Sequence, residues 1–428
     1  MVRSPLGTIL LSFPFASMHS SRMPLSVFTR RRALVSAGSL LVAGAVPAKA
    51  AADPSPVDRG SVREGQVRFP AILRANEAGE GDQNGPLPEG QRVGFAVVAM
   101  GRLSVEQILP AFAHSRKAKL AALVSGFPEK LHVLGRQYGL GADRLFGYEA
   151  FEKLASVDDV RVVYIVLPNS MHKEFVLRSA AIGKHVLCEK PMATNSQDAG
   201  TMITACKSEN LKLMIAYRCR YQPHHRELIR RVQSHEFGPV KLVEAVNAQN
   251  QGDPNQWRLR KALSGGGSLP DIGLYGLNAA RATLGEEPVE IQAQLSSTPN
   301  DPRFREVEES VVWTMRFPSG ALAALSTSYG THRGSRMAVH MDEASLILDH
   351  AFPYHGQRLS LVRARDGLET ETIIDVPAND QFALEIDHMA DCVLNDRAPD
   401  TPGEEGLRDM QLMADVYQAA QSGTRLQL

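Results

Sequence analysis

From residue 93 onward, short apolar runs alternate with amphipathic stretches, and this alternation restricts the possible folds more than any other feature. The first run, 93–99, reads VGFAVVA, which predicts a strand buried on both faces, as in a parallel sheet. Further runs lie at 120–124, 162–167, 185–188 and 212–216, separated by helical patterns at 106–113, 129–138, 173–181 and 197–208. The alternation predicts βαβ units and a doubly wound parallel sheet.

After Pro239 the pattern changes, because strand follows strand without a long helix between them. Alternating or β-branched segments lie at 240–249, 289–297, 311–317, 321–329, 336–340 and 359–362. Pro318-Ser319-Gly320 predicts a short turn that joins two of them as a hairpin. Helical patterns at 382–395 and 407–420 close the chain. This half therefore predicts a mostly antiparallel sheet with one covered face.

The chain has no net formal charge, because 47 Lys and Arg balance 47 Asp and Glu, and this gives no support for a nucleic-acid partner. Residues 1–50 nevertheless carry six basic residues and no acidic one. The remainder has 41 basic against 47 acidic residues. The composition thus indicates a basic leader on a mildly acidic body.

The leader has the layout of a twin-arginine export signal, removed near Ala50. Arg30-Arg31-Arg32 precedes an apolar stretch that runs to Val46, and Ala48-Lys49-Ala50 offers small residues around a cleavage point. The stretch has fewer than 18 residues, so we expect no stable membrane insertion of the mature chain. An uncleaved anchor or a chance basic start are the alternatives. We expect the export machinery as a partner, a periplasmic location, and an irregular arm over 51–91.

Metal chemistry is not expected. The four cysteines, at 188, 206, 219 and 392, lack the pairing of a zinc site and are too few to staple the fold. His224 and His225 have no carboxylate or cysteine companion at ligand spacing, so we expect them to be solvated.

The turn after the first strand carries part of a dinucleotide-binding fingerprint. Gly101 stands at the middle glycine of G-x-G-x-x-G, while Ala99 and Ser104 replace the outer two. Gly101, Arg102 and Leu103 would face a pyrophosphate at the start of the helix. An ordinary strand–helix turn is the alternative.

The end of the second strand favours NADP over NAD. NAD-binding proteins usually place a carboxylate there to bind the ribose 2′-hydroxyl. Here Ser125 occupies that place, with Lys130 soon after and Arg102 on the first turn. A hydroxyl and two cations would accept a 2′-phosphate, although a capping serine and a solvated lysine would read the same way.

Several motifs together resemble the Gfo/Idh/MocA oxidoreductase family, and its glucose–fructose oxidoreductase branch in particular. They are Glu189-Lys190-Pro191, the stretch 167–172 (LPNSMH), 217–221 (YRCRY), 257–260 (WRLR), 265–278 (GGGSLPDIGLYGLN) and 402–406 (PGEEG). The resemblance implies a Rossmann domain over 92–217 and an open-sheet domain with C-terminal helices over 218–428. It also implies sugar substrates, a tightly bound NADP and a homodimer or homotetramer.

The resemblance also implies roles for individual residues. Tyr275 matches the acid/base position, and Lys190 would lower its pKa from about 10 and bind the reacting oxygen. Asp271, four residues before Tyr275, would orient sugar hydroxyls or Lys190. Pro191 would follow a cis bond. Cofactor contacts are implied for Leu167, Pro168, Asn169, His172, Glu189, Lys190, Arg218, Trp257 and Arg258. Each of these residues also has a purely structural alternative.

Four functions remain open at this point. The first is an exported, NADP-retaining oxidoreductase that oxidises an aldose to its lactone and reduces a ketose or aldehyde. The others are a conventional NAD(P)-dependent sugar or polyol dehydrogenase, a glycoside hydrolase that oxidises its substrate transiently, and a sugar- or dinucleotide-binding protein without activity. The Lys190/Tyr275 pair argues against the last, and the export signal against the second.

Overall fold

The computed structural model describes residues 61–63, 66–68 and 85–428, which belong to two units divided after Glu80. The predicted export signal lies outside the described residues. In the arm, β1 (Ser61–Arg63) pairs antiparallel with β2 (Gln66–Arg68). The prediction of an irregular arm is therefore wrong for these six residues, because three-residue strands are too short to show a periodicity.

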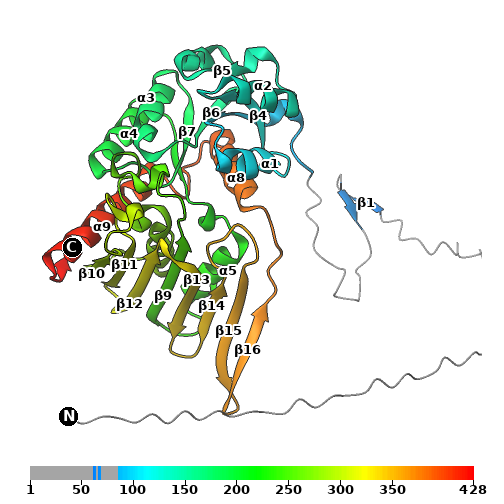
Figure 1. Cartoon of the computed structure of the whole chain (residues 1–428). Coiled ribbons are helices and arrows are strands. Elements are labelled where there is room, and N and C mark those ends of the chain that lie inside the picture. The colour runs from blue at the N-terminus through cyan, green and yellow to red at the C-terminus, as the bar shows by residue number, and fades with distance from the viewer. Residues whose placement is uncertain (1–60, 64–65, 69–84) are drawn as a thin grey trace, which may run out of the picture. The chain divides into compact units, whose positions relative to one another are not determined.

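A six-stranded parallel sheet forms the first lobe of the larger unit (Figure 1). Its strands are β3 (Val93–Val98), β4 (Ala118–Val124), β5 (Leu145–Phe146), β6 (Val160–Ile165), β7 (His185–Glu189) and β8 (Leu213–Ala216). Their order in the sheet is β5-β4-β3-β6-β7-β8. The chain first adds strands on one side of β3, up to β5, and then returns to add β6, β7 and β8 on the other side. Every residue of β3 is buried, which explains its unbroken apolar sequence.

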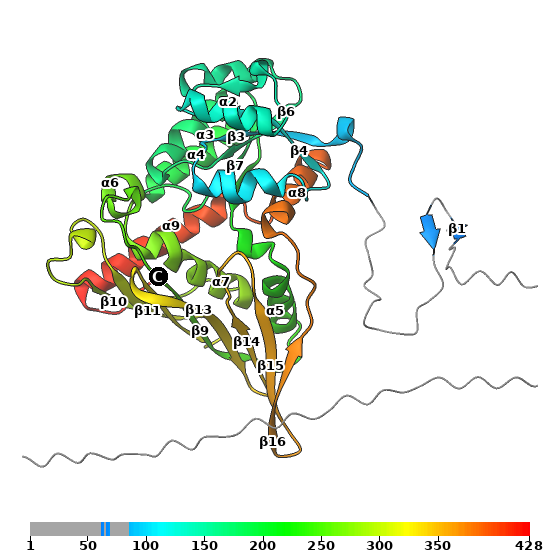
Figure 2. The same ribbon diagram turned by 45° about the vertical axis from the view of Figure 1, so that its right-hand side comes forward.

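Helices cover both faces of this sheet. They include η2 (Ser104–Ile108), α1 (Leu109–Ala111), α2 (Pro128–Gln137), α3 (His172–Ala181) and α4 (Ser196–Ser208). One more comes from the far end of the chain: α8 (Gln381–Leu394) buries Phe382, Ile386 and Met389 against the same core as β3 and α2. Helix α8, drawn in orange, lies beside β4 in both views and contacts β3, β4 and η2 (Figure 2). The predicted division placed this helix in the second domain, but its packing assigns it to the first.

The second lobe is a nine-stranded, mostly antiparallel sheet, as predicted. Its order is β16-β15-β14-β13-β9-β12-β11-β10-β17, and only β12 and β9 pair in parallel. The strands are β9 (Val240–Asn250), β10 (Glu290–Ser296), β11 (Ser310–Arg316), β12 (Leu322–Ser328), β13 (Gly330–Met341), β14 (Ser345–Asp349), β15 (Arg358–Arg365), β16 (Leu368–Ile374) and β17 (Leu426–Gln427). The predicted hairpin turn at 318–320 joins β11 to β12, with Gly320 at φ +90°.

One face of this sheet carries helices. Alternation is clear in β11, where Val311, Trp313 and Met315 are buried and Val312 is 58% exposed. The covering helices are α5 (Pro223–Gln233), α7 (Leu274–Leu284) and α9 (Gly403–Ser422), with η7 (Trp257–Leu259), α6 (Lys261–Ser264) and η8 (Leu269–Gly273) preceding α7. The sequence did not predict β14 or β16. No helix of the described residues is both long enough and apolar enough to cross a bilayer.

Candidate active site

The parallel strands end at one edge of their sheet, and the predicted catalytic lysine follows one of them. Lys190 comes directly after β7, and its peptide bond to Pro191 is cis, as the resemblance implied. Its ammonium donates to the backbone carbonyl of Asp271 at 2.5 Å and lies 3.4 Å from Oδ1 of that residue. The side chain of Lys190 is only 9% exposed. This contact joins the end of β7 to η8 and fixes the ammonium there.

Asp271 contacts two positively charged side chains, those of Lys190 and Arg258. Its Oδ2 accepts a hydrogen bond from the Tyr329 hydroxyl at 2.6 Å and lies 3.1 Å from Nε of Arg258. Burial would raise the pKa of Asp271, but Arg258 and Lys190 outweigh that effect and lower it to about 2. The carboxylate is therefore ionised at neutral pH and holds Lys190, one of its two expected roles. Tyr329 was not predicted, since a tyrosine at the end of a strand carries no distinguishing signal.

Tyr275, the second residue of α7, lies beneath the lysine. Lys190 Nζ is 4.5 Å from the centroid of its ring, while Arg218 Nε donates to its hydroxyl at 3.1 Å. Burial raises the pKa of Tyr275 above its usual range, and Arg218 lowers it only in part. The expectation that Lys190 lowers this pKa is therefore wrong: the phenol is protonated at rest, and the cation on its oxygen is an arginine.

Arg218 is buried between two aromatic rings. Its guanidinium carbon lies 4.6 Å from the Tyr275 centroid and 4.7 Å from that of Tyr354. Its Nη1 donates to Oε1 of Gln381 on α8 at 2.7 Å, and Nη2 donates to the carbonyl of Phe352 at 2.6 Å. Arg218 was predicted among the cofactor contacts, whereas these bonds place it on Tyr275. Gln381 and Tyr354 carried no sequence signal.

Trp257 and Arg258 enter from η7, in the second half of the chain. The Arg258 guanidinium carbon lies 4.6 Å from the centroid of the Trp257 ring, and its Nε pairs with Asp271. Both were predicted to cover the cofactor. The structure links them to Lys190 through Asp271, and their contact with the cofactor stays a prediction.

Leu167, Pro168 and Asn169 follow β6, and His172 is the first residue of α3, so all four lie beyond the carboxyl end of this strand, as predicted. His172 is fully buried, with Nε2 2.8 Å from the carbonyl of Leu167 and Nδ1 3.0 Å from that of Pro191. The imidazole thus joins the segment after β6 to the one that carries Lys190, and the predicted cofactor contact of His172 stays a prediction. Asn169 Nδ2 donates to the carbonyl of Ser264 at 2.8 Å.

Other predicted residues also lie in the core. Glu189 is 8% exposed and accepts a hydrogen bond from the Tyr164 hydroxyl at 2.9 Å. His224 and His225 are 8% and 3% exposed, and Nε2 of His225 lies 2.8 Å from the carbonyl of Ala351. The expectation that these histidines are solvated is wrong, because the amphipathic helix α5 turns them inward. Within the described residues, no group of His, Cys, Asp and Glu could hold a metal ion.

The turn after β3 is open on its outer side. A side chain at Gly101 would meet no protein atom within 4 Å, so a ligand can approach the backbone closely. Arg102 is 87% exposed and lies 3.7 Å from Glu106, and Leu103 adjoins it at the start of the helix. Ala99 has φ +78°, the left-handed region that a glycine adopts without strain.

Helix α2, which follows β4, supplies a cation next to this turn. Lys130 Nζ reaches back to the carbonyl of Met100 at 3.3 Å and lies 4.9 Å from the ring centroid of Phe127, which is 56% exposed. Ser125 is buried, and its Oγ accepts from the backbone of Phe127 at 3.1 Å. The open glycine turn and the cations of Lys130 and Arg102 fit a phosphorylated dinucleotide. Phe127 was not predicted, because its exposure is not readable from sequence.

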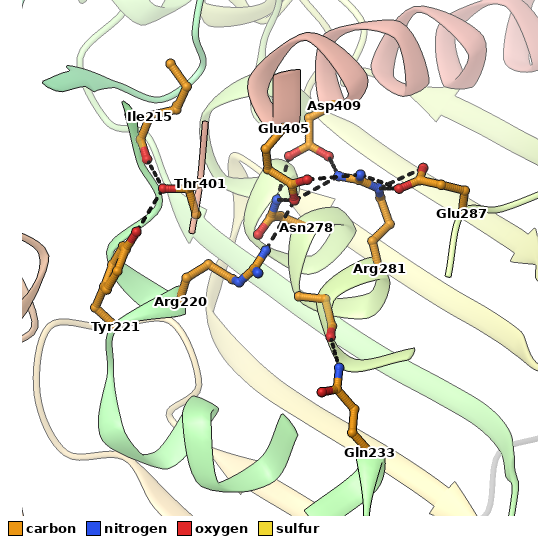
Figure 3. Close-up of polar contacts among 11 residues, drawn as sticks. Ile215, Arg220, Tyr221, Gln233, Asn278, Arg281, Glu287, Thr401, Glu405 and Asp409 are labelled. Atoms are coloured by element: carbon orange, nitrogen blue, oxygen red, sulfur yellow. Dashed lines mark hydrogen bonds and ion pairs between the residues drawn. The ribbon is translucent and has the colours of Figure 1, made fainter. Parts of the chain in front are cut away.

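A network of ion pairs ties the helix of Tyr275 to α9 (Figure 3). Arg281 on α7 bonds Asp409 at 2.5 Å and Glu405 at 3.2 Å on α9, and it also contacts Glu287. Asn278 donates to Glu405 and Asp409 at 2.8 and 2.9 Å. The side chains of Arg281 and Asp409 are 5% and 1% exposed. The network fixes α7, and with it Tyr275, against the C-terminal helix.

Comparison with known proteins agrees with this arrangement. Residues 93–217 match the model of the GFO/IDH/MocA oxidoreductase family with an NAD-binding Rossmann fold, and residues 225–347 match the GFO/IDH/MocA C-terminal domain. The D-xylose 1-dehydrogenase (NADP(+)) of Haloarcula marismortui is 31% identical over 342 residues, 78% of this chain and 93% of that protein.

Solved structures extend the similarity. An aldose–aldose oxidoreductase from Caulobacter crescentus, complexed with glycerol, is 40% identical with a TM-score of 0.76, over 79% of this chain and 100% of that one. A levoglucosan dehydrogenase in complex with NADH and levoglucosan shares the fold at 18% identity, with a TM-score of 0.70 over 79% and 99% of the two chains. The chain therefore belongs to the GFO/IDH/MocA family of oxidoreductases, with a Rossmann domain that binds a nicotinamide dinucleotide.

Proposed function

We propose that the protein is an exported sugar oxidoreductase that oxidises an aldose to its lactone and reduces the carbonyl of a second sugar, while NADP stays bound. The observation that carries the proposal is the cluster of Lys190, Asp271, Tyr275 and Arg218 at the carboxyl ends of the parallel strands. Two relatives support the substrate class, since their names describe reactions of aldoses.

The tyrosine supplies the proton chemistry. Because the pKa of Tyr275 is raised by burial, its hydroxyl can donate a proton to a sugar carbonyl that is being reduced. When a sugar hydroxyl is oxidised, the phenolate must accept that proton, and the Arg218 Nε–H at 3.1 Å stabilises the negative charge. Lys190 stabilises charge on the reacting oxygen. A bound nicotinamide would accept and return the hydride.

NADP is the preferred cofactor in this proposal. Ser125 stands where NAD-binding proteins usually place a carboxylate, and Lys130 and Arg102 offer positive charge beside it. The relative from Haloarcula marismortui is named as NADP-dependent.

We also propose tight retention of NADP, because an exported enzyme has no cytoplasmic pool of cofactor from which to reload. The twin arginine at 30–32 and the apolar stretch after it support a periplasmic location. A homodimer or homotetramer remains part of the proposal.

The test begins with the purified mature protein. Nicotinamide absorbance that survives extensive dialysis would support retention. Glucose plus fructose, and separately a pair of aldoses, are then supplied without any added cofactor. Lactone and polyol formed in equal amounts support the proposal.

A conventional dehydrogenase is the second candidate, favoured by the name of the xylose-oxidising relative. In that case lactone forms only with stoichiometric added NADP or NAD. This outcome would contradict retention while leaving the site chemistry intact.

A further inference from the structure

Behind Lys190 lies a buried row of three acidic groups that the proposed mechanism does not use. The Tyr164 hydroxyl on β6 lies 2.9 Å from Oε1 of Glu189 at the end of β7, and 3.3 Å from Oε2 of Glu385 on α8. Tyr164 and Glu385 are 0% exposed and Glu189 is 8% exposed. Oε1 of Glu385 is buried without a hydrogen-bond partner among the described residues.

Counting protons decides the state of this row. A phenol has one proton and can donate it to only one of the two carboxyl groups. If both carboxyl groups were ionised, the one that does not receive the phenol's proton would place its oxygen lone pairs against those of the Tyr164 oxygen. A second hydrogen bond in the row would need a proton on the other carboxyl, donated to the phenolic oxygen. The unpartnered Oε1 of Glu385 points to that residue, because an ionised carboxylate buried without partners costs far more than a neutral acid.

The surrounding charges give the same answer. Burial raises the pKa of Glu189 above its usual range, but the positive charges of the adjacent Lys190 and of Arg218 oppose that rise and favour the ionised form of Glu189 over that of Glu385. Burial raises the pKa of Glu385 well above its usual range, and the charge of Glu189 raises it further, while Arg218 opposes. The titratable groups that face Glu385 are Tyr164 from β6, Glu189 from β7, and Arg218, Cys219 and Tyr221 from η6 (Arg218–Arg220) and the residue after it.

Glu385 is also connected to the catalytic tyrosine. Gln381, one turn earlier on α8, accepts the hydrogen bond from Arg218 Nη1, and Arg218 Nε in turn donates to Tyr275. In the cluster as a whole, the cations are Lys190, Arg218 and Arg258, and the carboxylates are Glu189 and Asp271. With Glu385 neutral, one net positive charge remains to stabilise a phenolate or a developing oxyanion. Ionised Glu385 would cancel it.

We propose that Glu385 is a positioning residue that holds a proton at neutral pH, donates it to Tyr164, and so keeps the Lys190–Arg218–Tyr275 cluster net positive. The catalytic part of this inference rests on the proposed function, whereas the protonation of Glu385 does not. Loss of that proton at alkaline pH would weaken proton transfer at Tyr275 without removing any group that touches the substrate.

Infrared spectroscopy of the purified protein tests the proton directly. In the wild type at pH 7 we expect the carbonyl stretch of a protonated carboxylic acid that disappears in Glu385→Gln. Asp387→Asn is the matched control on the same helix, since Asp387 accepts bonds from Ser115 and from the backbone of Lys117 and should not give this band. A wild-type minus Glu385→Gln difference spectrum without the acid band would overturn the proposal.

A second variant covers the case in which Glu385→Gln does not fold. Tyr164→Phe removes the acceptor of the proton and should shift the frequency of the band without abolishing it. An unchanged frequency would contradict the hydrogen bond and the proposal with it.

The pH profile of sugar turnover tests the positioning role. Glutamine mimics the neutral acid, so kcat of Glu385→Gln at pH 7 should stay within about twofold of wild type, and the alkaline decline of the wild type should move upward by about one pH unit or more. Identical alkaline limbs would refute the positioning role even if the infrared band is present. If the wild type turns over no sugar pair, the proposed function fails, and the infrared result still decides the protonation of Glu385.

Discussion

The two ends of the dinucleotide site differ in how completely the protein has assembled them. At the end proposed to be catalytic, Lys190, Asp271 and Tyr275 are held by contacts from both lobes, and the side chain of Lys190 is only 9% exposed. At the phosphate end, Arg102 is almost fully exposed and Gly101 faces open space. The residues proposed to carry the chemistry are thus fixed by the fold, whereas those proposed to bind the phosphates are free to contact a ligand.

Replacing Lys190, the proposed catalytic lysine, should lower turnover and leave cofactor binding intact. We expect Lys190→Met to lower turnover by about 10³–10⁴-fold, because charge on the reacting oxygen loses its cation. Bound nicotinamide should remain, as measured by absorbance of the purified variant. Loss of the cofactor together with activity would mean that Lys190 acts mainly in binding.

The ion pairs of Arg281, which fix α7 and with it Tyr275 against α9, can be removed without changing a proposed catalytic residue. Arg281→Met leaves the buried Asp409 without its guanidinium partner, while Glu405 keeps Arg220, so we expect the free energy of unfolding to fall by about 3 kcal/mol. Denaturant unfolding measures this. Arg408, whose Nε lies 2.7 Å from Glu287 nearer the surface, is the control, and Arg408→Met should cost under about 1 kcal/mol. Equal losses in the free energy of unfolding for the two variants would show that the buried ion pairs stabilise the protein no more than the more exposed one does.

The phosphate end should respond in affinity rather than in rate. Lys130→Gln removes the cation next to the turn after β3, and we expect NADP to bind about tenfold more weakly while NAD binding stays the same. Titration of cofactor-stripped protein with each dinucleotide measures the two constants. An equal loss for both dinucleotides would contradict the role of Lys130 at the 2′-phosphate.

The smallest effect concerns backbone strain at the same turn. Ala99 adopts φ +78°, so Ala99→Gly should raise the free energy of unfolding by about 0.5–1 kcal/mol, the relief of strain exceeding the added freedom of the unfolded chain. Ala96→Gly, within β3, is the control and should destabilise the protein. Thermal unfolding of the two variants measures both changes, and destabilisation by Ala99→Gly would show that the alanine is not strained.

Much of this architecture was readable from the sequence. The apolar runs from residue 93 predicted the parallel sheet, and the alternation after Pro239 predicted the antiparallel one. Lys190, Asp271 and Tyr275 were also predicted, and they lie together. These features follow from local periodicity and from short motifs.

Features that depend on long-range packing were not readable. Helix α8 looks like part of the second domain by its position in the chain, yet its apolar face completes the core of the first. Arg218 was expected at the cofactor, and His224 and His225 in solvent, because no local pattern reveals which partner a polar side chain meets after folding. The direction of the Tyr275 pKa depends on burial, which only the folded structure provides.

One rapid-mixing measurement tests the central claim most directly. Purified protein is mixed with glucose without added cofactor, and the absorbance of reduced nicotinamide is followed, first in the wild type and then in Tyr275→Phe. In the wild type we expect a single rise that matches one bound dinucleotide per chain and is reversed by fructose. In the variant, which still retains its cofactor, the rise should be slower by at least about 10²-fold. Equal rates in the two proteins, or no rise in the wild type, would contradict it.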